Sequence, residues 1–161
     1  MATLSVWRFD TPGGADQAET TIETLAKEQL ITILDAATVS WAPEKKKPKT
    51  RQLHSLAGAG ALGGAFWGML FGLLFFVPLL GMAVGAAMGA LAGSLSDVGI
   101  DDDFIKRARD EITPGSSALF LMSSGAVVDK VRDAFRSDRP ELVSTNLSDS
   151  QERALREVFA D

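Results

Sequence analysis

Near the start of the chain, apolar residues first cluster in a short stretch and then recur at helical spacing. Residues 4–9 predict a strand, and the Thr-Pro-Gly-Gly sequence at 11–14 predicts a turn. From residue 15 to residue 29, apolar side chains lie three and four positions apart, which predicts a helix. A second strand is predicted from residue 30 to residue 41. The first part of the chain therefore predicts a β-α-β unit.

The C-terminal part repeats this order of elements. Residues 118–122 predict a strand, residues 127–135 a helix and residues 141–145 a closing strand. Two β-α-β units predict an α+β domain of the ferredoxin-like, split β-α-β type. We expect its sheet to be mainly antiparallel, with the helices on one face.

Two further helices are predicted outside these units. One opens at Asp101, Asp102 and Asp103, whose carboxylates suit a helix N-terminus, and it ends at the Thr-Pro-Gly sequence 113–115. The other is a C-terminal helix that begins at Ser148, with Gln151 in the position of a capping box.

The segment 55–96 separates the two halves and contains no charged residue. Glycine recurs there at every fourth position in two series: Gly60, Gly64, Gly68 and Gly72, then Gly81, Gly85, Gly89 and Gly93. On a helix, each series forms a smooth stripe that allows another helix to approach closely. The sequence therefore predicts an apolar glycine-zipper hairpin, residues 55–96, inserted into a domain made of residues 1–54 and 97–161.

The lengths of the two predicted arms bear on whether the hairpin crosses a membrane. Arm one, residues 56–77, has 22 residues and would extend about 33 Å as a helix, enough for a hydrocarbon core of about 30 Å. Arm two, residues 79–95, has only 17. The tip at 77–80 has no polar residue, which favours a hairpin that dips into the bilayer or one buried inside an oligomer.

Two alternatives concern the faces of these arms. The glycine stripes either pack the arms against each other or pack them against a second chain. The large side chains of arm one cover the other directions, where they are available to lipid or neighbouring chains, and Trp67 is interpreted as either a core or a lipid-facing residue. These large side chains are Phe66, Trp67, Leu70, Leu73 and Phe76.

A basic run precedes the hairpin. It contains Lys45, Lys46, Lys47, Lys49 and Arg51. As a membrane flank, it places the α/β domain on the cytoplasmic side of the membrane. The alternatives are a solvated loop for this run and a soluble cytoplasmic assembly for the protein.

Composition narrows the chemistry. The net charge of −5 makes nucleic-acid binding a poor fit, and no cysteine is present among the 161 residues. The Gly-x-Gly-x-x-Gly sequence at 58–63 has no acid about 20 residues later, as a dinucleotide site requires. His54 is the only histidine, and we interpret the acids at 97–103 as helix caps. We expect no catalytic residue, metal, cofactor or small-molecule substrate.

Several stretches resemble one bacterial family. They are residues 5–10, Trp41 with residues 47–52, residues 60–68 and residues 98–104. This combination is similar to the family catalogued as domain of unknown function 1269. The resemblance implies a bacterial source, a predicted membrane protein and no established activity. A weaker similarity to general-stress proteins with a glycine-zipper segment implies a role in stress or in the cell envelope.

The hypothesis drawn from these features is a non-enzymatic, membrane-associated structural or interaction protein. It would form homo-oligomers through its glycine-zipper hairpins and contact membrane lipid. The alternatives are a small channel, transporter or membrane-remodelling oligomer, and a ligand-binding sensor domain.

Overall fold

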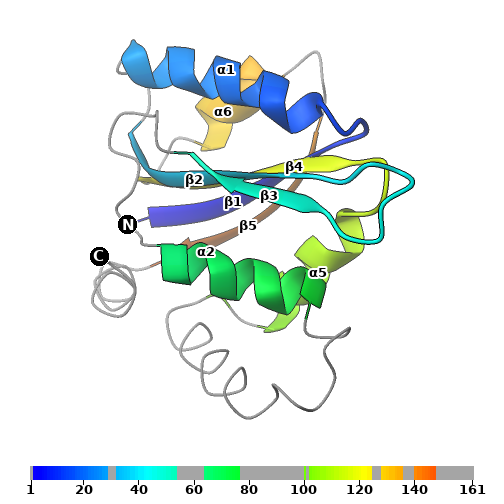
Figure 1. Ribbon diagram of the computed structural model, residues 1–161. Helices are drawn as coiled ribbons and strands as arrows, with labels where there is room; N and C mark the ends of the chain where they lie inside the picture. The colour runs from blue at the N-terminus through cyan, green and yellow to red at the C-terminus, as the bar shows by residue number, and fades with distance from the viewer. Residues whose placement is uncertain are drawn as a thin grey trace.

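The computed structural model describes residues 2–28, 32–53, 64–76, 100, 102–124, 128–135 and 140–147 (Figure 1). Several predicted features lie outside these residues: the second arm of the hairpin with its four glycines, Gly60, the segment containing His54, and the C-terminal helix from Ser148.

The described elements follow the predicted order, with one strand added. They are β1 (Ala2–Phe9), α1 (Gly14–Lys27), β2 (Ile33–Ser40), β3 (Lys49–Gln52), α2 (Gly64–Phe71), the π-helix η1 (Gly72–Phe76), α5 (Asp102–Glu111), β4 (Ser117–Ser124), α6 (Val128–Ala134) and β5 (Glu141–Leu147). The predicted strands and helices of both β-α-β units are confirmed, as is the helix that ends before Thr113.

The five strands form one antiparallel sheet in the order β3-β2-β4-β1-β5. Because β1 and β2 both pair antiparallel with β4, they run parallel to each other on either side of it. By the same reasoning, β4 and β5 run parallel on either side of β1. Each β-α-β unit therefore contributes two strands that are separated by a strand of the other unit.

Helices cover both faces of this sheet (Figure 1). One core lies between the sheet and α1 with α6, and it contains Trp7, Ile22 and Phe135. The other lies between the sheet and α2, η1 and α5, and it contains Leu4 and Phe120 among others. The expectation of helices on one face is wrong, because the apolar segment supplies a cover for the second face.

The central strand β4 shows how one sequence serves two cores. Ala118, Phe120 and Met122 belong to the core under α2 and α5, while Leu119 and Leu121 belong to the core under α1 and α6. Successive side chains of a strand point to opposite faces. Both sets of side chains in β4 are therefore buried, and these five apolar residues are all at most 1% exposed.

The edge strand β3 was not predicted. Residues 49–52 pair antiparallel with residues 37–40 of β2, although the sequence there is charged and was interpreted as a basic flank. An edge strand needs backbone hydrogen bonds on only one side, and charged side chains on it oppose pairing with other chains. The polar composition that obscured β3 in the sequence is thus typical of its position in the sheet.

Candidate functional site

The described part of the apolar segment consists of α2 and η1, and one of its faces is buried against the sheet. Its buried side chains are Trp67, Leu70, Phe71, Leu74 and Phe75, each at most 8% exposed. Their spacing of three and four residues forms a single helical stripe. Trp67 and Leu70 therefore belong to the core and do not face lipid or neighbouring chains, because the sheet presents an apolar face that these side chains cover.

Aromatic rings make up much of this contact. Phe71 stacks between Trp67 and Phe75, with ring centroids 5.8 and 6.2 Å away. Phe120 of β4 meets Phe71 edge-on at 5.1 Å and Trp67 edge-on at 6.3 Å. Edge-to-face and offset stacks at such separations are the favourable geometries for aromatic pairs. The α2 segment is therefore packed as an integral layer of the domain.

The change from α-helix to π-helix at Gly72 alters the backbone hydrogen bonding of the segment. The Nε–H of Arg109, on α5, donates to the carbonyl oxygen of Leu74 at 3.2 Å. A π-turn interrupts the regular i to i−4 pattern, so a donor from a neighbouring helix helps to satisfy the carbonyl groups there. Neither η1 nor Arg109 was predicted, since a single turn of π-helix has no distinctive residue pattern.

Three of the eight predicted stripe glycines lie in the described residues. Gly64 begins α2, Gly68 is exposed, and Gly72 is partly buried at the start of η1. Apart from its chain neighbours and the backbone of its own helix, no described residue comes within 4 Å of a Cβ atom built at Gly68. The glycine side of α2 at Gly68 is thus open, whereas the aromatic side is closed by the sheet.

The sequence placed the basic run beside the start of the apolar segment. In the structure, the beginning of this run lies near η1, further along that segment. Residues 42–48 form the turn between β2 and β3, and Lys45, Lys46 and Lys49 are exposed. Trp41, just before this turn, packs edge-on against Phe75 of η1 with ring centroids 5.9 Å apart. The basic turn therefore borders the end of η1 in space, although in sequence it precedes the start of the apolar segment.

Arg51, the last cation of the predicted flank, is engaged within the domain. It extends from β3 to α1, where its Nη2 lies 2.5 Å from Glu19 Oε2 and 3.2 Å from Asp16 Oδ1. The hydrogen bond to Glu19 and the negative charge of both carboxylates raise the pKa of Arg51 above its usual value. Arg51 therefore joins the edge strand to α1, and its charge is largely balanced there.

A buried carboxylate, Asp35, was also missed. It is fully buried in β2 beside an irregularity in the pairing with β4. Its Oδ1 accepts a hydrogen bond from the Ala36 N–H at 2.9 Å, and the Gln52 side-chain nitrogen lies 3.5 Å from both carboxylate oxygens. The available signal was an acid within an otherwise apolar strand. Its contacts support a structural role at the β2–β3 pair.

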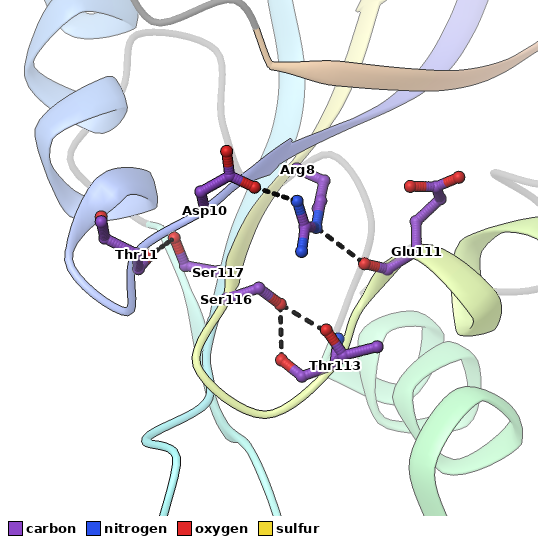
Figure 2. A network of polar contacts seen from close by, with 7 residues as sticks. All are labelled: Arg8, Asp10, Thr11, Glu111, Thr113, Ser116 and Ser117. Atoms are coloured by element: carbon purple, nitrogen blue, oxygen red, sulfur yellow. Dashed lines mark hydrogen bonds and ion pairs between the residues drawn. The ribbon is translucent and has the colours of Figure 1, made fainter.

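Figure 2 shows a polar corner where β1, β4, α1 and α5 meet. Ser117 Oγ donates to the Thr11 carbonyl oxygen at 2.7 Å and accepts from the Ala15 N–H at 2.8 Å. It thereby satisfies a backbone donor in the first turn of α1, whose N-cap is a glycine without a side-chain cap.

The same corner also secures the end of α5. The Arg8 Nε–H donates to the Glu111 carbonyl oxygen at 2.9 Å, and the Arg8 guanidinium contacts Asp10. A cation at a helix C-terminus complements the helix dipole. Ser116 closes the following turn through the Thr113 N–H and carbonyl groups, at 3.0 and 2.6 Å. These polar groups bond to each other and to backbone, which indicates a structural corner.

The described residues contain no cluster of three or more histidine, cysteine or acidic side chains that would hold a metal ion. Asp103 is exposed in the first turn of α5, while Asp97 and Asp101 lie outside these residues. Within the same part of the chain, no helix is long and apolar enough to cross a membrane.

These features define an antiparallel α+β domain whose sheet is covered on one face by an uncharged, glycine-bearing helix. The chain belongs to the family of proteins of unknown function DUF1269, whose model matches residues 61–160. The predicted family is thereby confirmed, although residues 5–10 and 47–52, which contributed to the resemblance, lie outside the match. No curated protein and no solved structure matches the chain. The family description assigns no activity.

Proposed function

We propose that this protein is a membrane-associated structural or interaction protein that self-associates through the glycine side of its apolar segment. The proposed fold is a ferredoxin-like, split β-α-β domain with β3 added at one edge, and the order β2-β4-β1-β5 of the other four strands supports it. The proposed location is a bacterial cytoplasmic membrane with the domain on the cytoplasmic side. The uncharged composition of residues 55–96 supports membrane association.

The observation that carries self-association is the open position at Gly68. Trp67, its neighbour, is 2% exposed and faces the sheet, so the domain has already occupied that side of α2. At Gly68, the described part of the chain outside this helix places no atom within 4 Å of where a Cβ would be. An uncharged helix with one side packed on the sheet and an exposed glycine on another side is suited to a second helix that approaches closely.

The decisive experiment enlarges Gly68 and measures assembly by sedimentation velocity. Because space is available in the single chain, Gly68→Leu should leave the domain folded while it blocks close approach of another helix. We expect a shift from oligomer to monomer, with an unchanged near-ultraviolet circular dichroism spectrum. Gly68→Ala should retain the oligomer, since alanine also permits small-residue packing.

A matched control is available on the opposite side of the sheet. Gly13, the N-cap of α1, is likewise open: beyond its two chain neighbours, none of the described residues lies within 4 Å of a Cβ built there. Gly13→Leu therefore adds the same side chain at an open glycine outside the apolar segment, and it should leave the oligomer intact. An oligomer of unchanged size in Gly68→Leu would contradict the proposed self-association.

Membrane association is tested separately by fractionation of cells with a carbonate wash. Retention in the pellet, with release only by detergent, is the expected result. A protein that stays in the supernatant as a large particle without detergent would contradict membrane association and leave self-association standing.

A further inference from the structure

We propose that the β2–β3 turn, together with Trp41, docks on a lipid surface that carries anionic headgroups. The proposal rests on the membrane association proposed above and identifies the docking face and the lipid chemistry. Lys45, Lys46, Lys47 and Lys49 fall within five residues, with Glu44 as the neighbouring acid. The charge of Arg51 is excluded from this cluster, because Asp16 and Glu19 balance it.

Hydrogen bonds connect the beginning of this turn to the loop that precedes β4. The Trp41 N–H donates to the Ser116 carbonyl oxygen at 3.0 Å, and the Trp41 carbonyl oxygen accepts from the Gly115 N–H at 2.7 Å. Gly115 has a φ of +89°, a backbone conformation that favours glycine. The Trp41 indole Nε1–H then donates to the Lys45 carbonyl oxygen at 3.0 Å. These bonds anchor the beginning of the turn, from Trp41 to Lys45, where the lysine cluster starts.

Trp41 connects the basic turn to the apolar segment. Its indole is only partly buried, and its ring meets Phe75 of η1 edge-on at 5.9 Å. Figure 1 shows the β2–β3 turn and the end of the α2 segment at the same side of the molecule. Tryptophan is enriched where hydrocarbon meets water, and lysine clusters beside such positions bind anionic headgroups. Trp41 therefore lies between the lysine-bearing turn and the uncharged segment that contains η1.

This order also favours lipid over nucleic acid as the partner. The chain as a whole carries a net charge of −5, and long-range attraction to nucleic acid requires a predominantly basic face. A local basic cluster that borders an uncharged apolar segment matches the interface of an anionic bilayer, where both components contribute to binding.

The test compares full-length protein on two kinds of vesicle at low salt. One kind contains phosphatidylcholine alone, and the other contains phosphatidylcholine with phosphatidylglycerol. We expect tighter binding to the anionic vesicles, measured by co-sedimentation. In the double variant Lys46→Gln/Lys49→Gln, the partition coefficient for the anionic vesicles should fall roughly 30-fold, because each lysine near the surface contributes to attraction.

A control with the same change in net charge separates this face from bulk charge. Lys27→Gln/Arg132→Gln removes two exposed cations from α1 and α6, on the other face of the sheet. This variant should bind anionic vesicles nearly as the unmodified protein does. Equal loss in both double variants would overturn the proposal, since it would show dependence on net charge alone.

The other outcomes distinguish this proposal from the proposed function. Equal binding to both kinds of vesicle, unaffected by Lys46→Gln/Lys49→Gln, would overturn the docking face and leave membrane association standing. Binding to neither kind of vesicle would overturn both the docking face and the proposed membrane association, and it would leave self-association standing. Binding to a DNA duplex through the same lysines, without binding to vesicles, would replace lipid by nucleic acid as the partner.

Discussion

Aromatic side chains pack the helices onto both faces of the sheet in the same way. The outward sides of α1 and α2, which lie on opposite faces, differ in their charge. On one face, Trp7 and Phe9 meet Phe135 edge-on, each at 5.5 Å. On the other, Phe120 meets Phe71 and Trp67 edge-on. The outward side of α1 carries acids and Lys27, whereas α2 contains no charged residue at all. Burial against the sheet therefore explains why the inner side of α2 is apolar, but it does not explain why the rest of α2 also lacks charge.

The largest expected effect tests whether the two inner faces are equivalent. Phe71→Ala and Phe135→Ala each remove a ring that is at most 5% exposed and contacts other aromatic rings. Each should lower the free energy of unfolding by about 3–5 kcal/mol, measured by urea denaturation. A loss of under about 1 kcal/mol for Phe71→Ala alone would show that α2 is not an integral layer of the domain.

Substitution of one glycine in each of α1 and α2 should have smaller effects on the free energy of unfolding. A Cβ at Gly14 of α1 would lie 2.5 Å from the Phe9 Cβ, whereas a Cβ at Gly68 of α2 would meet open space. Gly14→Ala should therefore destabilise the fold by about 1–3 kcal/mol. Gly68→Ala should stabilise it by up to about 1 kcal/mol, because alanine is the better helix former.

Thermal and urea unfolding of the two glycine variants, carried out at a concentration where both are monomeric, would measure these changes. We predict that the two substitutions change the free energy of unfolding in opposite directions. Destabilisation by Gly68→Ala would mean that the glycine side of α2 is occupied in the folded monomer, and it would weaken the argument for self-association.

The smallest effect concerns the outer side of α1. Arg51→Ala removes the ion pairs to Asp16 and Glu19, but the Arg51 side chain is half exposed. Solvent and salt screen such pairs, so the cost should be about 0–1 kcal/mol and should shrink as salt is added. Because the raised pKa keeps Arg51 charged throughout the physiological range, titration of this group should add no pH dependence there. A cost independent of salt would assign Arg51 a packing role instead.

The sequence was most informative where periodicity and burial agree. The stripe containing Ala18 and Ile22 predicted α1, and the apolar run at 118–122 predicted β4. It was least informative for β3, because Lys49 and Arg51 satisfy the needs of an edge strand without an alternating pattern. The absence of charge in the apolar segment was correctly noted. Its contact with the sheet was missed, since a helix that is apolar all round does not reveal which side is buried.

The candidate site was predictable to a similar, limited degree. The spacing that gives Gly68 its place in a stripe is visible in the sequence, but its exposure is not. The lysines were recognised as a group, yet their position beside Phe75 depends on the turn between β2 and β3. The contact of Trp41 with Phe75 was not visible in the sequence, because these residues lie far apart in the chain.

The position of β4 between β1 and β2 has a consequence for the order of synthesis. The ribosome completes α2 and η1 about 40 residues before β4, which at roughly 5–20 residues per second takes about 2–8 seconds. During that interval the sheet lacks its central strand, and Phe120 is not yet available to cover Trp67 and Phe71. The nascent chain therefore passes through a period in which α2 and η1 lack the central strand that covers them, and chaperones or a nearby bilayer can meet this apolar stretch first.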